Sequence, residues 1–261
     1  MRLDLYLFQN NYVKSRQKAK TLIEAGNVKL NGNVILKPSY DINSDICYNI
    51  EVIDNCPFVS RGGLKLEGII NFAKIDVNNK VCIDIGASTG GFTDCLLQNG
   101  ATKVFAIDSG TNQLAQKILE NKKVISLENY NARNLIYDDI GELADIITID
   151  VSFISQNLII PSVCKLLKTD GCYLSLIKPQ FETNKSSIGK GGIVKDKKAR
   201  LNAVMSVVDC ANNNNLNCFC FIKSPIQGGD GNIEYLAAFS KNATPLNNEF
   251  IKKIVLEWFG D

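Results

Sequence analysis

Residues 84–92 read DIGASTGGF, a glycine-rich stretch between two apolar segments. The segment before it, Lys80–Ile85, has the apolar bias of a buried strand, and Phe92–Asn99 has the pattern of a helix that Gly100 would end. A strand, a glycine-rich turn and a helix in this order form a ligand-binding arrangement in α/β proteins. The stretch therefore predicts an open α/β sheet that binds a ligand at the carboxyl ends of its strands.

The residues around this turn indicate the kind of ligand. A second strand, Lys103–Ile107, leads directly to Asp108, whose carboxylate can accept hydrogen bonds from both hydroxyls of a ribose. The turn is not a dinucleotide fingerprint, because Ser88 stands where a second glycine would let the backbone approach a pyrophosphate. S-adenosylmethionine has no pyrophosphate, and its cationic sulfonium and amino group favour an acid at the end of the first strand. We therefore predict S-adenosylmethionine as the cofactor, with binding residues Asp84, Gly86, Ala87, Ser88, Thr89, Gly90, Gly91, Phe92, Asp108, Asn131 and Asp150.

Apolar segments that alternate with helical ones continue the sheet along the chain. The alternation is typical of a doubly wound, Rossmann-like α/β sheet. Asp150 and Lys178 each follow a strand directly, so both should lie at the edge where such sheets hold ligands. The predicted helices are Asn157–Leu167 and Lys197–Ala211, and the predicted strands are Lys123–Leu127, Asp145–Ile149, Cys172–Ile177, Cys218–Ile222 and Tyr235–Phe239.

The first 40 residues differ from the rest of the chain in charge. The chain has a net charge of only +2, whereas Met1–Tyr40 holds seven basic and two acidic residues. Ser15 can cap a helix that ends at Gly26, and Val28–Leu30 and Val34–Leu36 flank an Asn-Gly turn, which predicts a hairpin. A basic helix beside a hairpin suits the phosphates of folded RNA. The candidate RNA contacts are Arg2, Lys14, Arg16, Lys18, Lys20, Lys29 and, further along the chain, Arg61.

Composition narrows the possible chemistry. The chain has no histidine, which removes the commonest general base near neutral pH, and its nine cysteines are scattered without a CxxC pair. We therefore expect reduced cysteines and no metal site. No apolar stretch approaches the roughly 20 residues of a transmembrane helix, and the first ten residues lack the pattern of a signal peptide. These features predict a soluble cytoplasmic protein.

Several motifs resemble known families. The helix SRQKAKTLIEAG followed by VKLNGNVI is similar to the S4 RNA-binding domain, within residues 1–50. The motifs SRGGLKLEG, DIGASTGGFTD, DVSFIS, LIKPQFE and GNIEYL occur in this order over nearly the whole chain. They resemble the TlyA family of rRNA 2′-O-methyltransferases, whose catalytic domain is similar to the FtsJ methyltransferases. One departure is Tyr130, where a smaller polar residue is expected on the adenine side.

This resemblance implies a topology and a catalytic tetrad. A class I methyltransferase sheet has an antiparallel last strand, so Glu234, just before that strand, should reach the same edge as Asp150 and Lys178. The tetrad of the family falls here on Lys65, Asp150, Lys178 and Glu234. We assign Lys178 as the base that takes the proton of a ribose 2′-hydroxyl. An ordinary lysine is charged at neutral pH, so this role requires partial desolvation or a neighbouring cation such as Lys65.

The resemblance also implies a domain organisation and a substrate. We expect an S4-like domain over residues 1–56, a linker over 57–63 and a methyltransferase domain over 64–261. The protein would act as a monomer on ribosomal RNA within ribosomal subunits, with cytidine as the methylated nucleoside. Gly189–Gly192 either closes over the RNA strand or is an ordinary surface loop.

Two other functions stay open at this point. The fold can serve an RNA-binding protein without catalysis, which the intact tetrad disfavours. The protein can also be a membrane-active hemolysin, because relatives of the family sometimes carry that name. The sequence disfavours this second alternative, since no segment has the basic and apolar faces that insertion into a membrane surface requires.

Overall fold

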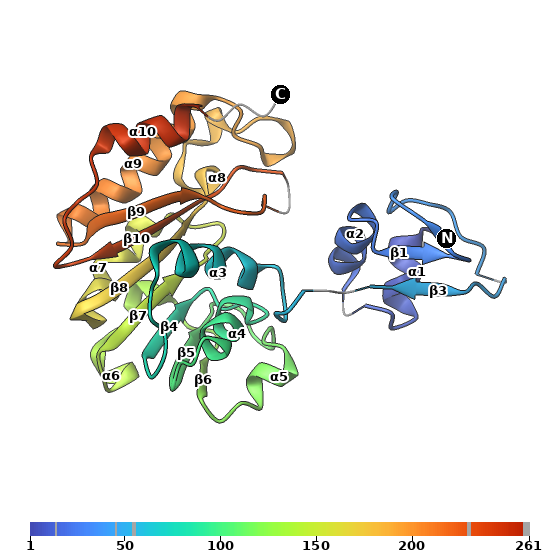
Figure 1. The fold of residues 1–261 in the computed structure, drawn as a ribbon, viewed down its shortest axis with the longest axis horizontal. Coiled ribbons are helices and arrows are strands. Elements are labelled where there is room, and N and C mark those ends of the chain that lie inside the picture. Colours follow the sequence, from blue (N-terminus) through green and yellow to red (C-terminus); the bar gives the residue numbers. More distant parts are fainter. Residues whose placement is uncertain (14, 45, 54–55, 229–230, 258–261) are drawn as a thin grey trace. The chain divides into compact units, whose positions relative to one another are not determined.

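The computed structural model describes residues 1–13, 15–44, 46–53, 56–228 and 231–257 (Figure 1). The chain divides into two compact units, Met1–Pro57 and Phe58–Asp261, which are described separately. Among the residues that the structure describes, none of the helices is both long and apolar enough to cross a membrane.

The N-terminal unit packs two helices against a small antiparallel sheet. As predicted, Ser15 caps the second helix, and its side chain accepts a hydrogen bond from the backbone N–H of Lys18 at 3.1 Å. The hairpin is shorter than predicted, and a third strand that the sequence did not indicate pairs with the first. The elements are α1 (Leu3–Gln9), α2 (Arg16–Glu24), β1 (Val28–Leu30), β2 (Asn33–Val34) and β3 (Ile50–Val52), with the sheet order β2-β1-β3.

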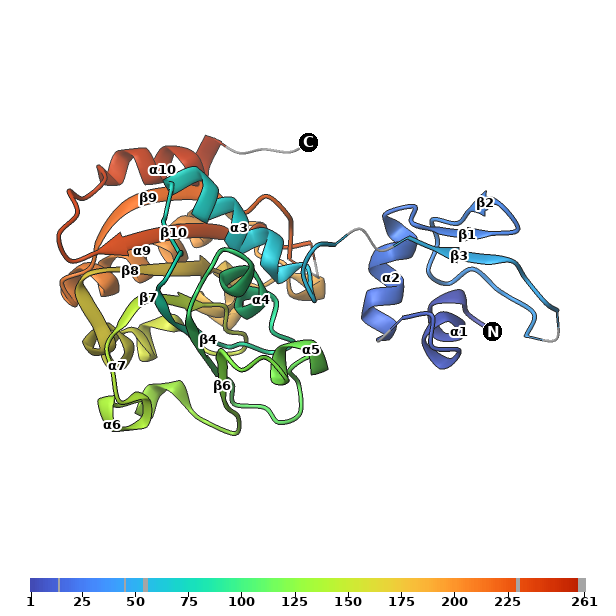
Figure 2. The same cartoon turned by 60° about the horizontal axis from the view of Figure 1, so that its bottom comes forward.

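The second unit is built on a seven-stranded sheet of order β6-β5-β4-β7-β8-β10-β9 (Figure 2). Each of the seven strands was predicted, and the bounds differ by at most one residue except at the start of β8. The strands are β4 (Val81–Ile85), β5 (Lys103–Ile107), β6 (Val124–Leu127), β7 (Ala144–Ile149), β8 (Leu167–Ile177), β9 (Asn217–Lys223) and β10 (Tyr235–Ser240). The longer helices are α3 (Gly62–Ala73), α4 (Gly91–Gln98), α9 (Lys197–Asn213) and α10 (Asn248–Glu257).

The direction of β10 brings residues from both ends of the unit to one edge. Strands β4 to β8 are parallel to one another, whereas β10 is antiparallel to both β8 and β9. The expected antiparallel strand is therefore confirmed. Tyr235 pairs with Ile177, so Glu234, one residue before β10, lies beside Lys178, one residue after β8.

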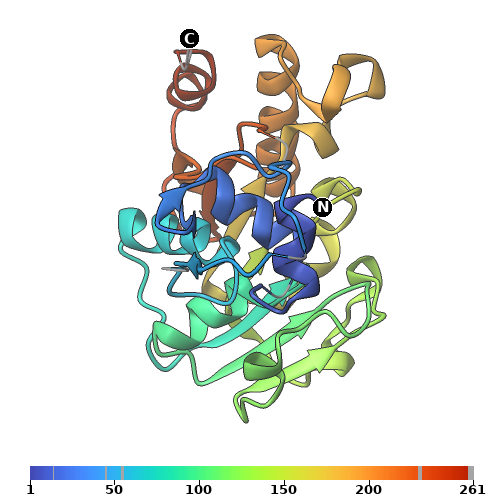
Figure 3. The same ribbon diagram turned by 90° about the vertical axis from the view of Figure 1, so that its right-hand side faces the viewer.

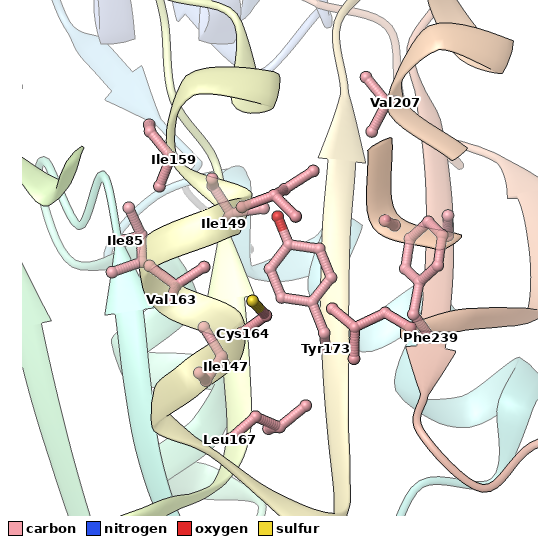
Figure 4. Close-up of a cluster of buried hydrophobic side chains, with 14 of the residues drawn as sticks. Ile85, Ile147, Ile149, Ile159, Val163, Cys164, Leu167, Tyr173, Val207 and Phe239 are labelled. Atoms are coloured by element: carbon pink, nitrogen blue, oxygen red, sulfur yellow. The ribbon is translucent and has the colours of Figure 1, made fainter. Parts of the chain in front are cut away.

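Helices cover both faces of this sheet (Figure 3). On one face, α3 packs against α4, β8 and β10. On the other face, α9 packs against β9, and a continuous core contains the buried rings of Tyr173 and Phe239, whose centroids are 5.7 Å apart (Figure 4). This arrangement is the predicted doubly wound α/β sheet, with a core that holds the carboxyl ends of the strands in place.

One predicted helix requires correction. The helix predicted over Asn157–Leu167 is three short pieces: a 3₁₀ turn, α7 (Ile160–Val163) and a second 3₁₀ turn. Pro161 explains the break, because proline lacks the N–H that a helix interior needs. Helix α3 starts at Gly62, and Gly63 passes so close to Phe58 that any side chain there would collide with its ring.

Candidate functional site

Two adjoining hollows open at the carboxyl ends of the parallel strands. The first, here called the lysine hollow, has a volume of about 280 Å³ and is lined by Ser60, Arg61, Gly62, Lys65, Gly86, Ala87, Ser88, Thr89, Gly91, Phe92, Asp150, Ser152 and Lys178. The second, the Asp108 hollow, has a volume of about 380 Å³; its lining includes Gly86, Ser88, Asp108, Gln113, Tyr130, Asn131, Asp150 and Ser152. The hollows share Gly86, Ser88, Asp150 and Ser152, so they meet at the glycine-rich turn.

The glycine-rich turn is shaped by backbone conformations that most residues avoid. Gly86 has φ +80° and Gly90 has φ +89°, and Ser88 also has a positive φ of +48°. A Cβ atom on Gly86 would collide with the carbonyl oxygen of Asp150 and lie 3.1 Å from Val151. Glycine at this position therefore lets β4 and the segment after β7 approach each other where the two hollows meet.

Replacing Gly86 with alanine should abolish ligand binding at the turn. The added methyl group would push the Asp150 segment away, and the positive φ would add backbone strain of about 1–3 kcal/mol. Gly141→Ala is the matched control, because Gly141 has φ +78° but nothing within 4 Å of the position of a Cβ atom. We expect S-adenosylmethionine titration calorimetry to lose its signal for Gly86→Ala only; equal affinities in the two variants would argue against this role of the turn.

Asp108 lies where the sequence predicted it. Its two carboxylate oxygens accept hydrogen bonds from the backbone N–H groups of Ser88 at 2.7 Å and Gly110 at 2.7 Å. These bonds hold the carboxylate at the wall of the Asp108 hollow. A carboxylate oxygen can accept more than one hydrogen bond, so both oxygens can still receive the hydroxyls of a ribose.

Asp84 lies beneath the hollows and lines neither of them. Its side chain is fully buried and accepts hydrogen bonds from the hydroxyls of Thr93 at 2.7 Å and Thr148 at 2.8 Å. The sequence placed this carboxylate against the sulfonium and amino group, but the structure gives its oxygens to two threonines. Asp84 therefore links β4 to α4 and β7 through these two hydrogen bonds.

Burial makes the stability of the protein depend on pH through Asp84. Burial raises its pKa to about 6, although hydrogen bonds from Thr93 and Thr148 act in the opposite direction. In the unfolded chain an aspartate has a pKa of about 3.9. The folded state therefore binds the proton more tightly, and this group's contribution to stability falls as the pH rises from about 4 to above 6.

Asp84→Asn should remove that dependence. At about 1.4 kcal/mol per pKa unit, the wild type should lose about 3 kcal/mol relative to the variant as the pH rises from 4 to 7.5. Urea unfolding of both proteins at each pH gives the difference directly. A difference in unfolding free energy that stays constant across this range would contradict the buried, protonatable state of Asp84.

The four predicted tetrad residues form two ion pairs. The Nζ atom of Lys178 lies 2.6 Å from Oδ1 of Asp150, and the Nζ atom of Lys65 lies 2.5 Å from Oε2 of Glu234. All four side chains are largely shielded from solvent. Lys65, Asp150 and Lys178 line the lysine hollow, whereas Glu234 lies behind it and contacts Lys65.

Ser152 is a site residue that the sequence reasoning missed. Its hydroxyl oxygen accepts a hydrogen bond from Nζ of Lys178 at 3.0 Å, and it lines both hollows. Two acceptors, Asp150 and Ser152, therefore fix the terminal nitrogen of Lys178. The signal was present in the DVSFIS motif, but spacing along a loop does not show which side chain turns toward the lysine.

An aromatic edge borders the site. Phe153 has a positive φ of +63° and its side chain is 92% exposed, although it is a large apolar residue. Its ring centroid lies 5.1 Å from that of Phe181, and the ring of Phe181 lies 5.9 Å from Nζ of Lys178. Phe153 also lines the Asp108 hollow, so this aromatic pair stands at the border of the site.

The adenine side of the predicted site has its own hydrogen bonds. Tyr130, the departure from the family pattern, donates a hydrogen bond to Asp139 at 2.6 Å, which raises the pKa of its hydroxyl to about 12. Asn131 caps a 3₁₀ turn by accepting a hydrogen bond from the N–H of Arg133. Tyr130 and Asn131 both line the Asp108 hollow. The hydroxyl of Tyr130 is directed at Asp139, so the larger side chain can be accommodated there.

The basic residues of the N-terminal unit are partly engaged within it. Asp4 is fully buried, and its carboxylate accepts hydrogen bonds from Nε of Arg2 and Nε of Arg16, each at 3.0 Å. Burial by itself would raise the pKa of Asp4, but the hydrogen bonds from Arg2 and Arg16 outweigh it and the pKa is lowered. Each arginine side chain stays almost half exposed, and Lys29 pairs with Glu51 at 3.3 Å. Lys18 and Lys20 lie on α2, and Lys14 lies outside the described residues.

Comparisons with known proteins fit both units. A family model described as FtsJ-like methyltransferase matches residues 58–241, and one described as S4 domain matches residues 1–45. Hemolysin A of Brachyspira hyodysenteriae is 43% identical over 92% of this chain and 99% of its own length. The 16S/23S rRNA (cytidine-2′-O)-methyltransferase TlyA of Mycobacterium tuberculosis is 36% identical over 90% of this chain and 87% of its own.

A solved structure from Streptococcus thermophilus that carries a hemolysin name is 39% identical and superposes with a TM-score of 0.79, covering 98% of this chain and 94% of that one. The family model covers well over half of the chain, and the relatives align with almost all of it. The chain therefore belongs to the FtsJ-like methyltransferase family, in the TlyA group that has an S4 domain at its N-terminus.

Proposed function

We propose that this protein transfers the methyl group of S-adenosylmethionine to the 2′-hydroxyl of a ribose in ribosomal RNA, with cytidine as the nucleoside and ribosomal subunits as the substrate. It would act as a monomer in the cytoplasm. The observation that supports this most is the position of Lys178, which lines the lysine hollow and whose nitrogen is held by Asp150 and Ser152.

The two hollows suit S-adenosylmethionine in size and chemistry. Their shared border at Gly86 and Ser88 leads from an acidic ribose partner, Asp108, to a second acid, Asp150. Because Gly86 has no side chain, the space beside the turn stays open for the cofactor. S-adenosylmethionine has no pyrophosphate, so the turn does not need to bind one. Asp108 would hold the ribose, and the turn from Gly86 to Phe92 would hold the methionine part. When bound, the cofactor supplies an electrophilic methyl group on a positively charged sulfur.

Lys178 then does the proton chemistry. The Nζ atom of Lys178 forms an ion pair with Oδ1 of Asp150 at 2.6 Å and donates a hydrogen bond to the hydroxyl of Ser152 at 3.0 Å, so these two residues set its position. A ribose hydroxyl in the lysine hollow would give its proton to Nζ, which would leave the oxygen's electron pair free to attack the electrophilic methyl group that the cofactor would supply, with the thioether as the leaving group. Asp150 would stabilise the lysine once it carries the positive charge. The hydroxyl would thus become a better nucleophile only when it lies between Nζ of Lys178 and the methyl group of the cofactor.

Lys65 and Glu234 would act as a second pair. Lys65 lines the lysine hollow, so its ammonium can hold the oxygen of the hydroxyl or a neighbouring phosphate. Glu234 is 3% exposed and binds Lys65, which keeps the ammonium in one position. The pair would orient the substrate, while the proton moves to Lys178.

RNA would be held on both units. In the N-terminal unit the candidates are Arg2, Lys14, Arg16, Lys18, Lys20 and Lys29, and in the second unit Arg61 at the wall of the lysine hollow. Arg2 and Arg16 would present to phosphates the N–H groups that Asp4 does not use. Asp4 would thus fix their orientation. The exposed aromatic edge of Phe153 and Phe181 suits a base that leaves its stack.

The direct test is a methyl-transfer assay with labelled S-adenosylmethionine. Purified 30S and 50S subunits from cells that lack the protein are compared with deproteinised 16S and 23S rRNA. We expect label in the RNA of at least one subunit. Cofactor binding without transfer to any of these four substrates would favour the alternative of an RNA-binding protein without catalysis.

A further inference from the structure

A lysine-rich segment follows the site motif that contains Lys178. The segment from Thr183 to Lys198, here called the basic loop, leads into α9 (Figure 3). Its one acidic residue, Asp196, is used as the cap of α9, where it accepts a hydrogen bond from the N–H of Ala199 at 2.6 Å. All five of its lysine side chains are exposed: Lys185, Lys190, Lys195, Lys197 and Lys198.

The start of the basic loop is fastened to the site. Lys178 is the residue before α8 (Pro179–Glu182), and Glu182 at the end of this helix is partly buried. Its carboxylate accepts hydrogen bonds from the hydroxyl of Ser155 at 2.5 Å and from the N–H of Gln156 at 2.9 Å. Both donors belong to the segment that also holds Asp150 and Ser152. The loop therefore leaves the site at a fixed point.

The end of the loop is fastened to the segment that carries Glu234. Asn232 is 2% exposed; its side chain donates a hydrogen bond to the carbonyl of Gly192 at 2.9 Å and accepts one from the N–H of Val194 at 3.1 Å. The buried Arg200 adds hydrogen bonds to the carbonyls of Val194 and Lys195, each at 3.0 Å. The lysines therefore stand on a loop whose backbone is tied to the elements of both catalytic ion pairs.

We propose that the basic loop is an RNA-phosphate contact of the catalytic unit, which holds the backbone of the strand whose ribose enters the lysine hollow. The inference rests on the proposed function and adds a binding surface to it. Within the described residues, Lys185, Lys190 and Lys195 make no ion pair. Exposed cations on an anchored backbone can neutralise phosphates without ordering a mobile segment first.

The composition of the loop favours RNA over a membrane surface. A segment that inserts into a membrane interface needs apolar side chains on its exposed face. Here Val194 is buried, Ile188 and Ile193 are half-buried, and the exposed residues are lysine, asparagine, serine, glycine and the aspartate that caps α9. The loop thus offers charge and hydrogen-bond donors without an apolar face, which is the chemistry of phosphate contacts.

The test measures how salt weakens binding to ribosomal subunits. We compare the wild type with Lys185→Ala/Lys190→Ala/Lys195→Ala by fluorescence titration of 30S and 50S subunits between 50 and 200 mM KCl. Each lost phosphate contact lowers the slope of log K against log salt by about 0.7–0.9. Three lost contacts should reduce the slope by about 2 to 3, so that the affinity of the wild type falls about 30-fold more over this range than that of the variant.

Two further variants give the controls. Lys80→Ala/Lys122→Ala/Lys165→Ala removes the same charge from residues just before or near the starts of β4, β6 and β8, at the opposite edge of the sheet. Its salt slope should match the wild type within about 0.5. Lys185→Arg/Lys190→Arg/Lys195→Arg keeps the charge and should also match it. Equal slope losses in the two alanine variants, or none in the loop variant, would overturn the proposal.

Two outcomes separate this inference from the proposed function and from membrane binding. A loop variant that methylates subunits with unchanged KM and salt slope disproves the loop contact and leaves the function intact. A wild type that binds subunits with the expected slope but transfers no methyl group disproves the function and leaves the contact intact. If vesicles of phosphatidylglycerol bind the wild type more tightly than subunits do, and the loop variant loses that binding, the loop is a membrane contact and our assignment is wrong.

Discussion

Lys178→Ala is expected to reduce methyl transfer at least a hundredfold while S-adenosylmethionine binds within about threefold of the wild-type affinity. The variant loses the basic nitrogen that Asp150 and Ser152 hold at the wall of the lysine hollow. The residues proposed to bind the cofactor, from Gly86 to Asp108, are left unchanged. Single-turnover transfer to ribosomal subunits and calorimetric titration of the cofactor measure the two quantities separately.

Lys178→Arg distinguishes a base from a fixed positive charge. An arginine keeps the charge but cannot give up its proton under these conditions. If Lys178 takes the proton of the hydroxyl, the arginine variant should be about as inactive as the alanine variant. Substantial activity of Lys178→Arg would mean that this position supplies charge only, and another group would have to accept the proton.

The ion pair of Lys65 and Glu234 should show a large effect on both stability and activity. Glu234 is 3% exposed and the side chain of Lys65 is 11% exposed, so removing either partner leaves a shielded charge without its counterion. Lys65→Ala or Glu234→Ala should therefore cost about 3–5 kcal/mol of unfolding free energy. Urea unfolding at neutral pH measures this loss.

The double variant Lys65→Met/Glu234→Leu separates the two roles of the pair. It fills the same space without charges, so it should recover most of the stability that either single variant loses. Methyl transfer should stay at least a hundredfold below wild type, because the ammonium at the lysine hollow is gone. Recovery of activity together with stability would show that the pair is structural only.

The spacing of apolar residues in the sequence made the second unit the more predictable part of the chain. The seven strands have strong apolar patterns, and the glycine-rich turn identifies the strand that starts the binding site. The antiparallel β10, which brings Glu234 to Lys178, could be expected only from the family resemblance, since a strand pattern does not reveal its direction. The prediction of one helix over Asn157–Leu167 was wrong. The apolar residues have helical spacing there, but Pro161 interrupts the helix.

Side-chain environments were the less predictable part of the site. Asp84 follows the pattern of a ligand-binding acid, but Thr93 and Thr148 donate to it from α4 and β7. Those partners are distant in sequence, so only the folded chain shows that Asp84 is buried. Arg16 was predicted as an RNA contact, and its pairing with the buried Asp4 is likewise visible only in the folded chain. Contacts of this kind depend on tertiary packing, which a local pattern does not contain.

The most direct measurement of the central claim is the position of the transferred methyl group. Ribosomal subunits methylated by the wild type are hydrolysed in alkali, and a 2′-O-methyl group makes the adjoining phosphodiester bond resistant to cleavage. We predict one or a few resistant bonds at cytidines, which appear with the wild type and S-adenosylmethionine and are absent with Lys178→Ala. A methyl group found on a base, or resistant bonds that form equally well with Lys178→Ala, would contradict the account.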